Sequence, residues 1–187
     1  MPIPTSFDPN GVLAPGTYDA TLQDIKNSIL VNGNGNSPTW DKVWRKQLVD
    51  SASILINELW SVGIVDIFLD GSFVEEKDHP NDIDGYFDPH LSMLSVPDIV
   101  KYAKLISDLN ILNKYKVWNW DHNSRRQAPG SHKLQLPMWI IYRVELYPHL
   151  DQGTGIKDAF GNNLKFPSAF RQSRNGFIQK GIVRVIK

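Results

Sequence analysis

Two aspartates separated by a single residue, Asp82 and Asp84, are the first feature of the chain that could do chemistry. On a strand, alternate side chains point to the same face, so both carboxylates would lie together. At an effective dielectric of about 20, two unit charges about 5 Å apart repel each other by about 3 kcal/mol. The pattern therefore indicates either a well-solvated strand end or a bound cation. Mg²⁺ is a common choice, because it takes one or two carboxylates together with the phosphates of a substrate.

A Gly-Ser pair, Gly71-Ser72, precedes Asp82 with nine residues between them. Glycine lets the backbone turn sharply and approach a ligand closely. Ser72 offers a hydroxyl and a backbone N–H to a phosphate. We therefore expect the pair to bind phosphate beside the two carboxylates.

A third acid, Glu145, lies within the apolar run 138–147, "MWIIYRVELY". An unpaired acid in such surroundings is costly, so Glu145 requires a partner or a function. On a neighbouring strand it would complete a site able to hold two metal ions and to activate a hydroxyl. The alternative is that Glu145 pairs with Arg143 on the same strand face.

These residues need a sheet to position them, and the chain predicts one. Apolar residues recur every three or four positions from Trp44 to Leu59, which indicates a helix that Thr39 caps and Gly63 ends. Short apolar or β-branched runs predict strands, and further helices flank them. The expected strands are 64–70, 82–88, 115–121, 138–147 and a last one near 181–187, and the further helices are 20–29 and 97–110.

This order predicts an α/β (α+β) fold, in which a small mixed β-sheet is flanked by helices. Three sections are expected along the chain. An N-terminal arm, 1–38, is punctuated by Pro and Gly, and a core, 39–150, contains the acidic residues of the candidate site. A basic C-terminal extension, 151–187, is expected to pack on that core.

The net charge of the 187-residue chain is zero, but the charges are divided unevenly along it. Residues 1–100 carry 15 acidic and 5 basic side chains, whereas residues 101–187 carry 5 acidic and 15 basic ones. A basic wall facing an acidic one is what a site for metal and phosphate needs; the alternative is a chance segregation of solvated charges. Arg171, Arg174 and Lys180 are candidates for binding a triphosphate or an RNA acceptor, and the alternative for them is an ordinary solvated segment.

The composition also excludes several classes of protein. The chain has no cysteine, so disulfides, thiolate metal sites and a cysteine nucleophile are excluded. It has no run of about eighteen apolar residues, and its start lacks the basic and apolar regions of a signal peptide. A cytoplasmic protein with no membrane partner is expected.

In order and spacing, Gly71-Ser72, Asp82, Asp84 and Glu145 resemble the nucleotidyltransferase superfamily, which has the polymerase-beta-like fold. In that family, Gly-Ser follows a first strand, Asp-x-Asp lies on the next strand, and an acid lies on a later one. The stretch "DGSFVEEKDHPNDID" is especially similar to compact nucleotidyltransferase-like proteins of bacteria and their phages. Some relatives of that group act as toxins in abortive infection or in toxin–antitoxin pairs. The resemblance covers about residues 40 to 147 and, more weakly, the tail.

The resemblance implies transfer of a nucleoside monophosphate from a nucleoside triphosphate to an acceptor hydroxyl on RNA, protein or a small molecule. It implies that Asp82, Asp84 and Glu145 hold Mg²⁺ or Mn²⁺, and that Glu145 helps to deprotonate the attacking hydroxyl. Gly71 and Ser72 would bind the β,γ-phosphates. Catalysis would consist mostly of positioning and charge neutralisation.

The chain departs from the family pattern just after the Gly-Ser pair. Many active members have a basic residue there, whereas this chain has Phe73, Val74, Glu75 and Glu76. The charge that neutralises phosphate is then expected from other basic residues, namely Arg125, Arg126, Lys133, Arg171, Arg174 or Lys180. Two alternatives to an enzyme stay open: a catalytically inactive nucleotide-binding module with the same fold, and an interaction protein such as one half of a toxin–antitoxin pair.

Overall fold

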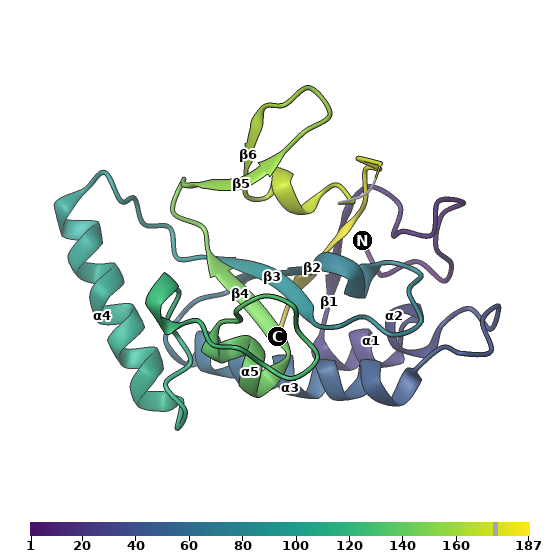
Figure 1. Ribbon diagram of the computed structural model, residues 1–187, viewed down its shortest axis with the longest axis horizontal. Coiled ribbons are helices and arrows are strands. Elements are labelled where there is room, and N and C mark those ends of the chain that lie inside the picture. The colour runs from purple at the N-terminus through teal and green to yellow at the C-terminus, as the bar shows by residue number, and fades with distance from the viewer. Residues whose placement is uncertain (174–175) are drawn as a thin grey trace.

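The computed structural model describes residues 1–173 and 176–187. A five-stranded mixed sheet forms its centre, with the strands in the order β1-β7-β2-β3-β4 (Figure 1). The predicted fold class, a small mixed sheet flanked by helices, is confirmed. The strands are β1 (Thr17–Ala20), β2 (Asp66–Asp70), β3 (Ile83–Asp88), β4 (Val144–Pro148) and β7 (Ile182–Val185).

Both end sections of the chain contribute to this sheet. β1 pairs with β7 in parallel, and β7 pairs with β2 in the antiparallel direction. β2 and β3 are antiparallel, whereas β3 and β4 are parallel. The section 1–38, predicted as an arm, therefore supplies an edge strand, and the section 151–187, predicted as an extension, supplies an inner strand.

Helices cover one face of the sheet and lie beneath it in Figure 1. They are α1 (Leu22–Asn27), α2 (Ile29–Asn32), α3 (Lys42–Ser61) and α5 (Pro137–Tyr142). The apolar stripe of α3 is buried in the main core, and each fully buried Leu contributes about 1.5–3 kcal/mol. The stripe includes Leu48, Ala52, Leu55 and Leu59.

The predicted N-cap of α3 is wrong, whereas the predicted glycine at its C-terminal end is confirmed. Asp41, not Thr39, is the N-cap: its Oδ1 accepts a hydrogen bond of 2.9 Å from the backbone N–H of Trp44. The hydroxyl of Thr39 instead donates to the Asp78 carboxylate. At the other end, Gly63 takes a positive φ of 87° directly after the helix, as predicted.

The C-terminal section covers the opposite face of the sheet. It contains the hairpin strands β5 (Gly153–Lys157) and β6 (Asn163–Lys165), which stand above the sheet in Figure 1, and the short turn η3 (Ser168–Phe170). Phe166 and Phe170 stack on Tyr86 of β3, with ring centroids 5.4 and 6.0 Å away. This aromatic cluster fixes the section onto the sheet.

Helix α4 (Val96–Leu112) lies at one edge of the molecule, on the left in Figure 1. It matches the predicted helix 97–110, with Pro97 and Asp98 in its first turn. The predicted helix 20–29 is divided into α1 and α2, because Ser28 leaves the helical conformation and caps α2. Among the described residues, no helix is both long enough and apolar enough to cross a membrane.

The prediction of one strand over 138–147 is wrong for its first half. Residues 137–142 form α5, which begins at Pro137 and ends where Arg143 takes the left-handed conformation with φ 55°. The Arg143 guanidinium packs 3.8 Å above the Trp139 ring, which favours this turn. Only the second half of the run is the strand β4.

The predicted strand at 115–121 is also wrong. Val117 and Trp118 are fully buried, but the Trp118 backbone pairs with a side chain rather than with a strand. The Asn110 side chain accepts from the Trp118 N–H at 3.1 Å and donates to its carbonyl at 2.9 Å. The Trp118 indole donates to Glu58 Oε2 of α3 at 2.7 Å. The segment is therefore held to the helices.

Candidate functional site

Three acids form a row across neighbouring strands on the sheet face opposite to the helices. In the strand register, Asp70 of β2 lies opposite Asp84 of β3, and Asp84 lies beside Glu145 of β4. Paired residues share a face, with Cβ atoms about 5 Å apart. The alternate residues Ile83 and Val144 point into the helical core, so the acids point away from it. The expected meeting of Asp84 and Glu145 is therefore present.

Asp84 packs directly against the Gly-Ser turn. A Cβ added at Gly71 would lie 2.8 Å from the Asp84 Cβ and closer still to Oδ2, so only glycine fits there. Gly71 also has a φ of 74°, which favours glycine. Ser72 follows it in the short turn η1 (Gly71–Val74). The structure thus brings Gly71, Ser72 and Asp84 together, as the sequence predicts.

Asp82 lies just before β3 and not on it, because the strand begins at Ile83. The Trp139 indole donates a hydrogen bond of 2.7 Å to Asp82 Oδ2. Asp82 is also close enough to Glu145 for its charge to raise the pKa of that carboxyl. All three predicted metal ligands, Asp82, Asp84 and Glu145, therefore gather at one edge of the sheet face.

Glu145 is almost fully buried and only partly hydrogen-bonded. Tyr147 donates to its Oε2 at 3.0 Å, whereas Oε1 is buried with no hydrogen-bond partner among the described residues. Burial raises the pKa of Glu145, the Tyr147 hydrogen bond and the charge of Lys133 oppose that rise, and Asp82 adds to it. The alternative pairing with Arg143 is wrong, because Arg143 ends α5 and stacks on Trp139.

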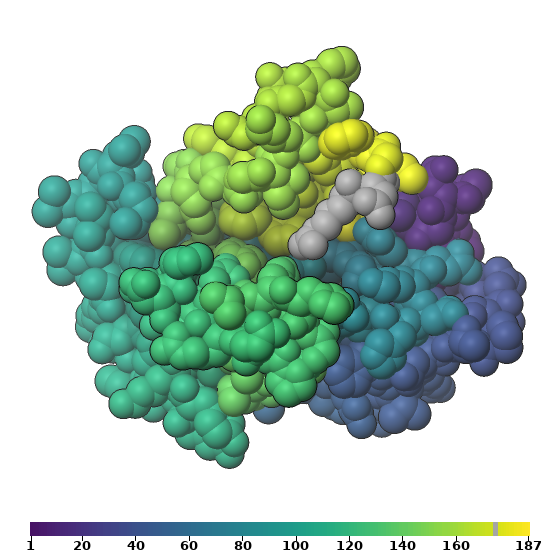
Figure 2. Space-filling model, viewed as in Figure 1, coloured from purple at the N-terminus to yellow at the C-terminus, as the bar shows by residue number. Residues whose placement is uncertain are grey.

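These residues surround a cleft of about 810 Å³. Two segments contribute to its lining: residues 130–133 and 135, which belong to the green segment at the front of Figure 2, and residues 169, 170, 172 and 173 of the C-terminal section. Its lining includes Gly71, Ser72, Asp82 and Asp84 from the acidic half of the chain. Glu145 does not line it. A cleft of this size is within the range of small-molecule sites.

Two of the three basic residues predicted to bind nucleotide, Lys180 and Arg171, are described by the structure, and they lie in different places. Lys180 lines the cleft. Arg171 does not: its guanidinium donates to the Gly16 carbonyl at 3.1 Å and to the Thr17 hydroxyl at 2.7 Å, which fixes it beside β1. Arg174 lies outside the described residues. Of the two described residues, the structure therefore brings Lys180 to the acidic site.

Lys180 is held by three acceptors at 2.8 Å: Asp70 Oδ1, Glu75 Oε1 and the Gly71 carbonyl oxygen. Burial by itself would lower the pKa of Lys180, but Asp70 and Glu75 together raise it. Burial raises the pKa of Asp70, which the Lys180 ammonium opposes. Lys180 therefore stays protonated and ties the Gly-Ser turn to the C-terminal section.

Lys133, which the sequence offers as another source of positive charge, also lines the cleft. Its ammonium has no hydrogen-bond or ion-pair partner in the part of the chain that the structure describes. Its positive charge nevertheless lowers the pKa of Glu145, against the effect of burial. Lys133 is thus a cation facing the acids from a separate loop.

Sequence reasoning missed Arg45, which is completely buried. Its guanidinium donates to four backbone carbonyls, those of Leu30, Phe73, Glu75 and Lys77, at 2.6–2.9 Å. Three of these carbonyls belong to the segment just after Ser72, so Arg45 fixes its path. The sequence does indicate that Arg45 is buried, since it stands three residues before Leu48 on the apolar face of α3.

Within residues 1–173 and 176–187, no group of three or more His, Cys, Asp or Glu side chains is placed to hold a metal ion by itself. The donor chemistry still suits Mg²⁺, which takes one or two carboxylates and completes its shell with water and phosphate oxygens. Glu145 Oε1 has unused acceptor capacity beside Asp84. The residues therefore fit a metal that arrives with a phosphate ligand.

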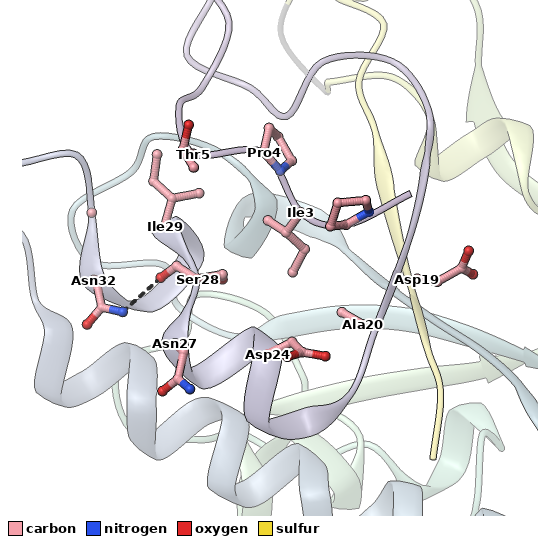
Figure 3. Close-up of a pocket in the computed structure, with 12 residues that line it drawn as sticks. Ile3, Pro4, Thr5, Asp19, Ala20, Asp24, Asn27, Ser28, Ile29 and Asn32 are labelled. Carbon is pink, nitrogen blue, oxygen red and sulfur yellow. Dashed lines mark hydrogen bonds between the residues drawn. The ribbon is translucent and has the colours of Figure 1, made fainter.

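A second pocket, of about 490 Å³, lies between the N-terminal residues and the helices α1 and α2 (Figure 3). Its lining includes Ile3, Asp19, Asp24 and Ile29. The carboxylates of Asp19 and Asp24 are already paired, with the N-terminal ammonium and with Thr21. This pocket contains none of the predicted site residues.

Searches of curated proteins and of solved structures gave no match to this chain. A family profile matches residues 5–186, which include nearly all of the chain and every residue of the candidate site. The protein therefore belongs to DUF6932, a family of unknown function.

Proposed function

We propose that this protein is a metal-dependent nucleotidyltransferase that moves a nucleoside monophosphate from a nucleoside triphosphate to an acceptor hydroxyl. One observation carries the proposal: Asp84 packs on the glycine of a Gly-Ser turn and stands in register with the buried Glu145, at the edge of a cleft of about 810 Å³. The lining of the cleft combines Asp82 and Asp84 with Lys133 and Lys180, so it contains both signs of charge that a triphosphate and its metal require.

Each residue has a role in this proposal. Ser72 and the neighbouring backbone N–H groups bind the β,γ-phosphates. Asp82, Asp84 and Glu145 would supply ligands for a Mg²⁺ or Mn²⁺ ion that arrives with the triphosphate, and the ion would neutralise phosphate charge. Glu145, whose buried Oε1 has no hydrogen-bond partner among the described residues, helps to take the proton of the acceptor hydroxyl. The hydroxyl oxygen bonds to the α-phosphorus, the bond from that phosphorus to the β-bridging oxygen breaks, and pyrophosphate leaves.

The acceptor in this proposal is RNA, protein or a small molecule. The setting we propose, a cytoplasmic toxin or phage-defence component, rests only on the resemblance of the stretch from Asp70 to Asp84. The experiment that follows therefore includes all three classes of acceptor.

The test is incubation of the protein with each α-labelled nucleoside triphosphate, Mg²⁺ or Mn²⁺, and either total RNA or a cell extract. We expect label to be transferred and pyrophosphate to be released. Asp84→Asn and Glu145→Gln should lower the rate by at least about a hundredfold, the scale of one lost electrostatic contact to a transition state. Asp88→Asn, at the far end of β3 on the same face, is the matched control and should keep the activity.

Two other outcomes would favour the alternatives. Calorimetric binding of a triphosphate without any transfer would support an inactive nucleotide-binding module. Neither binding nor transfer, together with a partner that co-purifies, would support an interaction protein.

A further inference from the structure

The ammonium of Lys180 is saturated by groups of this chain. An ammonium has three N–H donors, and Lys180 Nζ lies 2.8 Å from three oxygens: Asp70 Oδ1, the Gly71 carbonyl and Glu75 Oε1. Two of these groups are carboxylates, so one positive charge faces two negative charges. The side chain of Lys180 is 4% exposed, yet the residue lines the cleft.

The three groups that accept hydrogen bonds from Lys180 differ in how easily each could move away from its ammonium. The Asp70 side chain is completely buried, and the Gly71 carbonyl is part of the backbone beside Asp84. Glu75 is different, because its side chain is 26% exposed and lines the cleft. Its backbone is fixed, since its carbonyl accepts from Arg45 at 2.9 Å and its N–H donates to the Ser72 carbonyl at 3.3 Å. Only the Glu75 carboxylate can move without disturbing the turn.

We propose that the Glu75 carboxylate occupies the position on Lys180 that a phosphate of the substrate takes. A phosphate oxygen entering the cleft accepts the third N–H of Lys180, and the Glu75 side chain turns out to solvent. Asp70 stays in place, so the buried ion pair is kept. The inference rests on the proposed function for the identity of the ligand as a nucleoside triphosphate.

The replacement of the Glu75 carboxylate by a phosphate affects how tightly the site binds anions. A phosphate must displace a charge-assisted hydrogen bond before it forms its own, so Glu75 weakens binding of every anion at Lys180. It also discriminates by charge, because a triphosphate replaces the lost carboxylate better than a weakly charged anion does. The same contact closes the site in the absence of substrate.

The test is calorimetric binding of inorganic tripolyphosphate, in the presence of Mg²⁺, to the wild type, Glu75→Gln and Glu76→Gln. Glu76 is the matched control, because it lines the same cleft but its carboxylate accepts from the Asn34 side chain at 2.5 Å and not from Lys180. We expect Glu75→Gln to bind about tenfold more tightly, the scale of one charge-assisted hydrogen bond, and Glu76→Gln to change binding by less than about threefold.

A second pair of variants tests the role of Lys180 itself. Lys180→Met alone leaves Asp70 buried without a counter-ion, so the double variant Asp70→Asn with Lys180→Met is used, with circular dichroism to confirm folding. In this background, Glu75→Gln should no longer strengthen binding. Equal gains from Glu75→Gln and Glu76→Gln, a gain that persists without Lys180, or no binding by any variant would each overturn the inference.

The inference and the proposed function can fail separately. If the protein transfers nucleotide but Glu75→Gln does not strengthen tripolyphosphate binding more than Glu76→Gln does, the proposed function stands and the inference about Glu75 is wrong. If the variants bind tripolyphosphate in the expected pattern but the protein transfers nucleotide to no acceptor, the inference about Glu75 stands and the proposed function is wrong.

Discussion

Asp84 is the residue on which the geometry of the candidate site depends, because its carboxylate lies against the Cα of Gly71. The sequence predicts that these two residues are neighbours, from the order Gly-Ser and then Asp-x-Asp. It does not predict the contact itself, which follows from the antiparallel register of Asp70 and Asp84. The glycine is therefore needed for the space it leaves as well as for its backbone conformation.

Replacing this glycine should separate the two effects. Gly71→Ala adds a Cβ both at φ 74° and against Asp84, whereas Gly63→Ala adds one at φ 87° with no atom within 4 Å. We expect Gly63→Ala to lower the free energy of unfolding by about 1–2 kcal/mol, the cost of a left-handed alanine. Gly71→Ala should cost about 1–3 kcal/mol more, because the site is overpacked. Urea denaturation measures both; equal costs would show that Asp84 does not fill this space.

At the scale of elements, the segment after Ser72 is positioned by one side chain of α3. The buried Arg45 donates to the carbonyls of Phe73, Glu75 and Lys77. It therefore adds to the single antiparallel bridge that this segment forms, between Glu75 and Val12. A site built on a loop needs such support to keep its geometry.

Arg45→Met should remove this support and leave four buried or half-buried carbonyls without their donor. We expect the free energy of unfolding to fall by at least about 3 kcal/mol, measured by urea denaturation. Lys46→Met, the exposed neighbour, should change it by less than about 0.5 kcal/mol. A small effect of Arg45→Met would mean that water satisfies these carbonyls and that the segment is not held by α3.

Much of the element pattern could be predicted from the sequence, and the failures have physical reasons. The stripe of α3 follows from periodicity, and the strands β2 and β3 follow from short, mostly apolar runs. The run 138–147 predicts one strand, which is wrong for its first half, because a short apolar run does not distinguish a buried helix from a strand. In the segment 115–121, the side chains of Asn110 and Glu58 replace a sheet partner, and no local pattern encodes that.

The ionisation of Glu58 tests the contacts that hold the segment 115–121 to α3. Burial raises its pKa above the ordinary 4.5, against the hydrogen bonds from Trp118 and Asn113. The folded state therefore holds the proton more tightly than the unfolded state, so this contribution to stability is present below pH 4.5 and is lost as pH rises through the folded pKa. Glu58→Gln should show no such loss, so its stability relative to the wild type should increase with pH. Urea denaturation from pH 4 to 8 measures it, and a constant difference would contradict the raised pKa.

At the scale of the whole molecule, the site combines the two oppositely charged halves of the chain. The acids come from the region of β2 and β3, and the cations of the cleft include Lys133 and Lys180 from the basic half. The sequence predicts this division of charge. It does not predict that Lys180 would already be paired with Asp70 and Glu75, since those contacts span more than 100 residues.

The most direct measurement is the anomalous scattering of Mn²⁺ in crystals grown with a non-hydrolysable nucleoside triphosphate. The proposed function predicts a manganese peak bound by Asp84 and Glu145 or Asp82, with the phosphates at Ser72. A nucleotide bound elsewhere, or manganese absent from these carboxylates while the triphosphate is present, would contradict it.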